Sequence, residues 1–256
     1  MTSEAIQEKA GGGRLGLCAA CSFYPEFPEH RRCTPGDACI RAHSGRQIDR
    51  FLRQNPELAE NYLADLFWER RAIAARYAPV DRIFGLKSDQ DEVVRRVVAT
   101  RLPIDQLSSM IKDPDREVRL SVAARLAENL LGQLIHDPDY LIRATVARRL
   151  PHGQLSKLVH DPEREVRKVV AARLPTFALH LLADDHEPEV RALVAERALP
   201  ELAARLLQDS EWWVRLAAVS RAPSELLPSL LDDPECEVRE AARLRLADAP
   251  TARLEG

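Results

Sequence analysis

Apolar and polar positions recur along this chain with a constant period, from Asp89 to the C-terminus. In each unit an apolar residue directly precedes an arginine. These apolar residues are Val94, Val118, Ile142, Val166, Val190, Val214 and Val238. Within one unit, Val118, Val122 and Leu126 follow at i, i+4 and i+8. This spacing places them on one face and predicts a helix of about three turns with one buried side.

The sequence also indicates where each helix starts and ends. Asp113 and Pro114 suit an N-cap and a first helical turn, so we expect the aspartate of each unit to cap its helix. Proline or alanine follows the helix in most units and predicts its end. These residues are Pro103, Ala127, Pro151, Pro175 and Pro223.

A second apolar group follows each helix, for example Leu155, Leu158 and Val159. Only about nine residues separate the helix end from the next aspartate, so we expect a short helix tightened to 3₁₀ geometry. Solenoids built from two full helices use roughly 33–47 residues per unit. Leucine-rich repeats have a similar period, but their LxxLxLxxN strand motif is missing. The pattern predicts an all-α stack of seven 24-residue repeats over residues 89–256.

Residues 65–88 form a further unit that departs from the pattern. Asp65 lies one full period before Asp89, so the register continues. Arg70 occupies the position that is apolar in the other units, and Tyr77 occupies the position of a recurring arginine. A terminal repeat faces something other than another repeat, so such changes are expected of a cap.

We assign residues 49–88 to connector helices and this degenerate capping repeat. Pro56 interrupts the helical pattern and predicts a break between two connector helices. The aromatic side chains of Phe67, Trp68 and Phe84 are expected to pack where the cap meets the N-terminal segment.

Four of the five cysteines are clustered in the N-terminal segment. They are Cys18, Cys21, Cys33 and Cys39, spaced C-x2-C-x11-C-x5-C. A C-x2-C pair lets two thiolates reach one metal centre, and two further cysteines complete a four-sulfur shell. The intervening sequence is rich in turn-forming residues and too short for its own hydrophobic core. We assign residues 15–48 to a small irregular metal-binding domain and residues 1–14, which end in three glycines, to a flexible tail.

The spacing alone leaves the metal open. Zinc accepts four thiolates, usually from paired CxxC motifs, whereas an iron–sulfur cluster accepts less regular spacings such as this C-x5-C. A pair of disulfides is a weaker interpretation for a protein expected in a reducing compartment. His30 and His43 lie nearby, but four cysteines already complete the shell, so we expect both on the surface. Cys236 occupies a variable repeat position and is expected to be exposed and not a ligand.

Composition narrows the functional classes. The 256 residues carry a net charge of -3 and no lysine-rich run, so the chain has no general signature of nucleic-acid binding. Residues 1–17 lack the apolar segment of a signal peptide, and no run approaches the ~18 apolar residues of a membrane span. We therefore expect a cytoplasmic protein with no membrane partner. A phosphate-binding glycine loop, an HExxH motif and an activated nucleophile are all missing, so we expect no enzymatic activity.

The repeat D-P-x-x-x-V-R-x-x-V-A-x-R-L-P-x-x-x-L-x-x-L resembles the leucine-rich repeat variant family over about residues 15–256. The four clustered cysteines resemble that family's iron–sulfur module. The resemblance implies alternating α and 3₁₀ helices in a right-handed superhelical solenoid, preceded by a domain that carries a [4Fe–4S] cluster. The implied iron ligands are Cys18, Cys21, Cys33 and Cys39. Zinc remains the alternative cofactor, and the resemblance does not imply a partner.

Two arginine ladders run through the repeats, and Arg119 and Arg125 represent them in one unit. Both flank the buried face, so we expect their stems on apolar surface and their guanidinium groups in water. In this interpretation they contact aspartates or carbonyl groups of neighbouring repeats and set the stacking geometry. The alternative is that one ladder lines a groove that binds nucleic acid, with Trp212 and Trp213 adding stacking.

The function expected from the sequence is that of an iron–sulfur repeat protein. It would act as a scaffold or adaptor for an unidentified protein partner, with a cluster that is either redox-responsive or structural. A nucleic-acid-binding solenoid is the alternative.

Overall fold

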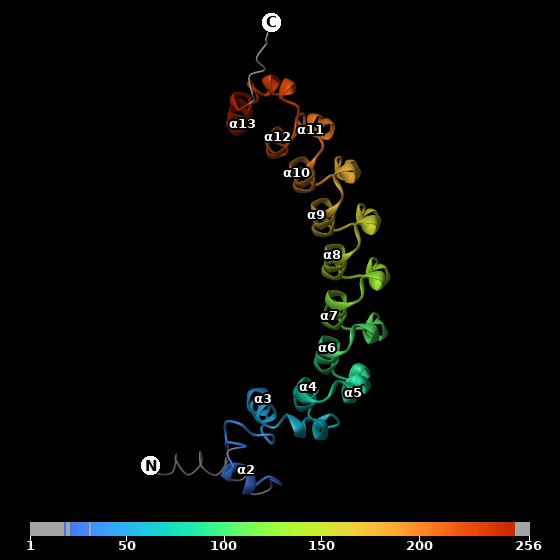
Figure 1. Ribbon diagram of the computed structural model, residues 1–256, viewed down its shortest axis with the longest axis vertical. Helices are drawn as coiled ribbons and strands as arrows, with labels where there is room; N and C mark the ends of the chain where they lie inside the picture. The colour runs from blue at the N-terminus through green and yellow to red at the C-terminus, as the bar shows by residue number, and fades with distance from the viewer. Residues whose placement is uncertain (1–17, 19–20, 31, 249–256) are drawn as a thin grey trace, which may run out of the picture. The chain divides into compact units, whose positions relative to one another are not determined.

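The computed structural model describes residues 18, 21–30 and 32–248 and divides the chain into two units, Met1–Leu126 and Ala127–Gly256 (Figure 1). The predicted tail over residues 1–14 and the end of the seventh repeat, residues 249–256, lie outside the described residues. Regular structure in the described part is helical, with one isolated bridge between Thr34 and Ala38 and no strand. The all-α prediction is confirmed.

The first unit contains the cysteine-rich segment, the connector helices, the capping repeat and the first repeat helices. Its elements are α2 (Glu26–Glu29), α3 (Gly45–Gln54), η1 (Pro56–Tyr62), α4 (Trp68–Tyr77), α5 (Val80–Ile83), η2 (Phe84–Ser88), α6 (Glu92–Arg101), η3 (Ile104–Met110) and α7 (Arg116–Arg125), where η denotes a 3₁₀ helix. The predicted break at Pro56 is confirmed, because α3 ends at Gln54 and η1 begins at Pro56.

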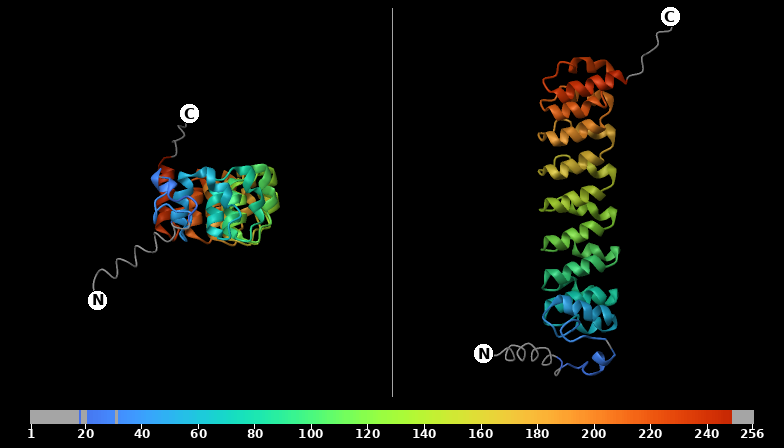
Figure 2. Two further views of the ribbon diagram at one scale, coloured as in Figure 1. Left: turned by 90° about the horizontal axis from the view of Figure 1, so that it is seen from below. Right: turned by 90° about the vertical axis from the view of Figure 1, so that its left-hand side faces the viewer.

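The second unit continues the alternation of α and 3₁₀ helices. Its elements are η4 (Glu128–Leu134), α8 (Tyr140–Arg149), η5 (His152–Leu158), α9 (Arg164–Arg173), η6 (Thr176–Leu182), α10 (Pro188–Arg197), α11 (Pro200–Leu206), α12 (Trp212–Val219), η7 (Ser224–Leu230) and α13 (Cys236–Ala247). Figure 1 shows α8, α9 and α10 side by side, with the short helices in a second column, and Figure 2 shows the stacked helices from another side. This is a solenoid of helical repeats, and α11 is the unit's exception to the 3₁₀ prediction.

Each repeat buries one apolar stripe from its α-helix and one from its short helix. In the first unit Val118, Val122 and Leu126 are fully buried, as the i, i+4, i+8 spacing predicts. Leu107 of η3 is also fully buried. A 3₁₀ helix reaches the next turn in few residues, so the unit can close within its short period.

The predicted helix start is wrong by two residues. α7 begins at Arg116, and its N-cap is Asp115, whose side chain accepts the backbone N–H groups of Glu117 and Val118 at 3.0 Å. Asp113 instead accepts the N–H of Asp115 at 2.9 Å and so fixes the turn before the helix. The recurring aspartate therefore shapes the turn, and where the residue two positions later is also an aspartate, as at Asp91, Asp115 and Asp139, it caps the helix.

The first arginine ladder is buried, contrary to the expectation that its guanidinium groups lie in water. Arg143 donates to both carboxylate oxygens of Asp161 in the next repeat, at 2.7 and 2.9 Å. It also donates to the carbonyl oxygen of Asp137 in its own repeat, at 2.8 Å. Arg167 repeats the pattern with Asp185, and its side chain is only 3% exposed. The ion pairs between repeats are confirmed, and they direct the guanidinium groups of Arg143 and Arg167 toward groups within the protein.

The second ladder binds carbonyl groups of the preceding repeat. Arg173 donates to the carbonyl oxygens of Ala147 and Leu150, at 2.6 and 2.9 Å. These groups belong to the C-terminal end of α8, where the helix leaves carbonyls without intrahelical partners and carries partial negative charge. Arg173 therefore caps the helix of the preceding repeat, and Arg197 caps α9 in the same way. In the first unit, Arg101 does the same for Ala75 and Ala78.

The capping repeat keeps the register and changes its contacts. Arg71 pairs with Asp89 at 2.8 Å through both oxygens, as in a regular unit. Tyr77, at the position of the second ladder, donates its hydroxyl to Asp49 of α3 at 2.8 Å. The predicted junction with the cysteine-rich segment includes Phe67, whose ring lies 5.9 Å from that of His43.

Phe84 does not follow that prediction. Its ring is partly exposed and lies 3.9 Å from the ammonium group of Lys87, on the short helix η2. Trp68 is also partly exposed and contacts Phe67 edge-on. Over the described residues, none of the helices has the length and apolar character needed to cross a membrane.

Candidate metal centre

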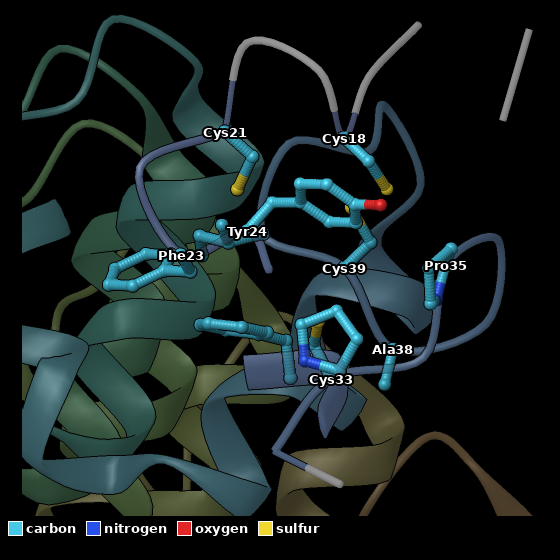
Figure 3. A pocket seen from close by; sticks show the side chains of 11 residues that line it. Cys18, Cys21, Phe23, Tyr24, Cys33, Pro35, Ala38 and Cys39 are labelled. Carbon is cyan, nitrogen blue, oxygen red and sulfur yellow. The ribbon is translucent and has the colours of Figure 1, made fainter. Parts of the chain in front are cut away.

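The four clustered cysteines line one pocket of the first unit (Figure 3). Cys18 is buried, whereas Cys21, Cys33 and Cys39 are partly exposed, and none forms a disulfide. The other walls are apolar or aromatic, and they include Phe23, Tyr24 and Phe51. The fold thus brings together the four residues that the sequence selected.

Backbone hydrogen bonds hold the cysteine-bearing loops. The N–H of Cys21 donates to the carbonyl of Cys18 at 2.9 Å, which closes the first pair into a turn. The N–H of Cys39 donates to the carbonyl of Gln47 in α3 at 3.1 Å. The Gln47 side chain donates to the carbonyl of Gly36 at 2.6 Å. Gly36 has a φ of 77°, a conformation that favours glycine and permits the tight turn between Cys33 and Cys39.

An aromatic cluster attaches the pocket to α3. Phe23 and Phe27 stack with ring centroids 4.4 Å apart, and Phe51 of α3 lies 5.8 and 6.1 Å from them. Phe51 is almost fully buried and also lines the cysteine pocket. The same side chain therefore belongs to the wall of the pocket and to the core beneath α3.

A residue that the sequence analysis missed completes this attachment. Asn55 is fully buried, and its amide donates to the carbonyl oxygens of Arg32 and Phe51, both at 2.8 Å. Its carbonyl oxygen accepts from the guanidinium of Arg32 at 2.8 Å. Asn55 thereby joins the residue before Cys33 to the end of α3. The sequence feature that could have identified Asn55 is its position directly before Pro56, where a helix ends.

The pocket is electrostatically suited to a cation. Burial raises the pKa of the Cys18 and Cys33 thiols, and the neighbouring cysteines raise it further because thiolates repel one another. Four thiolates so close together require positive charge to offset them. Iron or zinc supplies it, so the donor set fits a thiolate-bound metal centre.

A single ion and a cluster require different arrangements of the sulfurs. One tetrahedral zinc ion requires sulfurs about 3.8 Å apart, because each Zn–S bond is about 2.3 Å. Among the described residues, no group of three or more cysteine, histidine or acidic side chains is set to hold one ion. In a four-iron cluster each thiolate binds a different iron, so the sulfurs line a pocket without meeting at one point.

The cysteine pocket is narrow. Its cavity volume of about 20 Å³ matches a single water molecule. Between Cys21 and Cys39, the described residues contain one short helix, α2, and the isolated bridge between Thr34 and Ala38.

The remaining candidates lie away from the cysteine pocket. His30 and His43 are both exposed, as predicted, and neither lines the cysteine pocket. Cys236 is exposed, as predicted, and its thiol donates to Glu237 at 3.1 Å. It belongs to α13 of the second unit.

Comparison with known proteins identifies both parts of the chain. The family profile described as "LRV protein FeS4 cluster" matches residues 12–61, and the profile "Leucine rich repeat variant" matches residues 140–163 and 212–235. A solved structure described as a leucine-rich repeat variant with a novel repetitive structural motif is 54% identical, with a TM-score of 0.86. The alignment covers 90% of this chain and 98% of that one.

A curated relative is the uncharacterized 27.7 kDa protein in the nifB 3′ region of Rhodobacter capsulatus, 38% identical over 83 residues. The match covers 32% of this chain and about a third of that protein's length, 34%. The cluster profile, the repeat profile and the solved structure agree with the pocket and the repeats described above. The chain therefore belongs to the leucine-rich repeat variant family and is an iron–sulfur repeat protein.

Proposed function

We propose that this protein is a non-enzymatic adaptor in which a [4Fe–4S] cluster fastens the cysteine-rich segment onto the end of a partner-binding repeat array. The proposed iron ligands are Cys18, Cys21, Cys33 and Cys39, which line one pocket. When bound, the cluster supplies one-electron chemistry and a cross-link between chain segments. The sequence favours the cytoplasm, where thiols stay reduced.

Phe51 is the observation that carries the proposal. It lines the cysteine pocket and belongs to α3, and Asp49 of the same helix accepts the hydroxyl of Tyr77 from α4. A contact path therefore leads from the cysteines through α3 to the capping repeat. A cluster that fixes the pocket also fixes the helix on which the first repeat packs.

The repeats support the adaptor role by their surface. Phe177 and Leu181, four residues apart on η6, are both exposed although both are large and apolar, and a protein partner could cover them. No comparable observation favours nucleic acid, because the arginines of both ladders donate to groups within the protein. A nucleic-acid ligand would have to rely on other residues.

The test begins with the protein purified without oxygen. We expect about four irons and four sulfides per chain and little zinc. Replacement of Cys33 by serine should abolish or strongly reduce the iron content, whereas Cys236→Ser, at the exposed non-ligand cysteine, should leave it unchanged. A colourless protein with one zinc ion would overturn the cluster assignment.

The coupling to α3 needs a second measurement. We expect amide hydrogen exchange in α3 and α4 to speed up in Cys33→Ser and to stay unchanged in α9 and α10. If exchange in α3 is the same with and without the cluster, the cluster does not fasten the array. A reversible one-electron signal in the intact protein would add a redox role, and its absence would leave the cluster structural.

A further inference from the structure

Arg70 occupies a position that belongs to the hydrophobic core in every other repeat. The corresponding residues, Val94, Val118, Ile142, Val166, Val190, Val214 and Val238, are 0–1% exposed. The Arg70 side chain is only 16% exposed, so a guanidinium group stands largely buried where a small apolar side chain is the rule. Burying a cation is unfavourable unless its donors find partners.

The protein satisfies this guanidinium only in part. One terminal nitrogen donates to Asp65 at 2.8 Å, and the group lies 5.7 Å from the centre of the Phe67 ring. The Nε atom of Arg70 is buried and has no hydrogen-bond partner in the structure. Buried donors without partners are rare in native proteins, and a bound water or ion is one explanation for such a group.

Arg70 lines an open pocket beside the cysteine pocket. Its polar lining comes from Cys21, Ser22, Arg41, His43, Tyr62 and Arg70. The cavity volume of about 430 Å³ falls within the ~300–1,000 Å³ of small-molecule sites. Two arginines and a histidine face it, and no aspartate or glutamate is among its described lining residues. Arg70 itself pairs with Asp65.

We propose that this pocket, the Arg70 pocket, binds a small oxyanion, either a carboxylate or a phosphate. Guanidinium groups present paired N–H donors that match the oxygen spacing of both anions. The hydroxyl groups of Ser22 and Tyr62 can add neutral donors. The ligand would lie next to Cys21, so its charge would reach any metal centre held there. The site goes beyond the adaptor role and does not depend on it.

A competing explanation is that the arginines only offset the negative charge of the cysteine thiolates. The two explanations differ in what they predict for a soluble anion. A ligand site saturates, and its affinity falls when a lining donor is lost. A purely charge-balancing group gives no saturable binding, and its loss changes only the stability of the metal centre.

Titration calorimetry on the anaerobically purified full chain separates them, with inorganic phosphate and succinate as probes in a chloride buffer. We expect saturable binding of at least one probe, weakened about tenfold or more in Arg41→Gln and in Arg70→Gln. Arg82→Gln, an exposed arginine of the same unit outside the pocket, serves as the control and should bind like the parent. Iron content, measured for every variant, shows that the first unit is intact.

Arg70→Gln also removes the ion pair with Asp65 and could therefore prevent folding. In that case the Arg41→Gln variant alone tests the proposal. The probe that binds more tightly identifies the anion class, and either result supports the site. Absence of saturable heat for both probes at about 10 mM would overturn the proposal. Binding that is unchanged in Arg41→Gln would overturn it equally.

Discussion

Arg215 donates to both carboxylate oxygens of Asp233 in the following repeat, each at 2.8 Å. The two side chains are 12% and 4% exposed. Arg215 also donates to the carbonyl of Asp209 in its own repeat at 2.9 Å. One guanidinium thus fixes two successive repeats, and loss of its partner would leave a buried charge uncompensated.

We therefore predict that Asp233→Asn lowers the free energy of unfolding by about 3 kcal/mol, because it leaves the Arg215 charge without its counter-ion. Urea unfolding at pH 7, followed by circular dichroism, measures this loss. The control is Asp232→Asn at the adjacent exposed aspartate, which should change the free energy by less than about 0.5 kcal/mol. Equal losses of unfolding free energy in the two variants would show that the ion pair between Arg215 and Asp233 does not stabilise the protein.

The same pair predicts a dependence on acid. The Arg215 guanidinium holds the pKa of the Asp233 carboxyl below its ordinary value. A lowered pKa in the folded state stabilises the protein above the unfolded-state pKa of about 3.9, and this stabilisation is lost as the pH falls through the folded-state pKa.

We accordingly expect the stability difference between the parent and Asp233→Asn to be constant from about pH 7 to pH 5 and to shrink below about pH 4. Urea unfolding across this range measures it. A difference that instead shrinks between pH 7 and pH 5 would mean that another group, not this carboxylate, controls the effect.

Asn55 gives a prediction for the cysteine-rich segment. Asn55→Ala removes three hydrogen bonds and leaves the carbonyl groups of Arg32 and Phe51 without this partner. We expect a loss of about 2–3 kcal/mol in the first unit and faster release of iron to a chelator, because the loop before Cys33 is no longer tied to α3. Asn61→Ala, at an exposed asparagine of η1, is the control. Iron release at the parent rate would show that Asn55 does not support the metal centre.

The sequence was sufficient for the repeat because identical contacts recur in each unit. A pairing such as Arg143 with Asp161 leaves the same two residue types at the same spacing every time, so it is visible without coordinates. The start of each helix could not be predicted in this way, because Asp113 and Asp115 are both suitable N-cap residues. Only the geometry shows which carboxylate reaches the N–H groups of the first turn.

Some residues of the metal centre could likewise be predicted from the sequence, and others could not. Cysteine spacing identified Cys18 to Cys39 because few other roles need four thiols so close together. The aromatic wall and Asn55 were not identified, because a buried phenylalanine or asparagine has many possible roles and occurs once. Arg70 was noticed as a departure from the repeat, but its buried Nε and its pocket depend on how α4 meets the cysteine-rich segment.

The N-caps of the second unit allow a stabilising substitution. Asp139 caps α8 by accepting the N–H of Leu141 at 2.8 Å. Glu163 occupies the same position before α9 with nearly the same backbone angles, but its longer side chain makes no capping hydrogen bond. We predict that Glu163→Asp raises the free energy of unfolding by about 0.5–1 kcal/mol, since a short carboxylate can reach the first-turn N–H groups. The reverse substitution, Asp139→Glu, should lower it by a similar amount, and both are measured as urea midpoints with an unchanged slope. If neither variant shifts the midpoint, these caps do not limit stability, and the recurring aspartate that shapes the preceding turn, Asp161 in this repeat, is enough to start the helix.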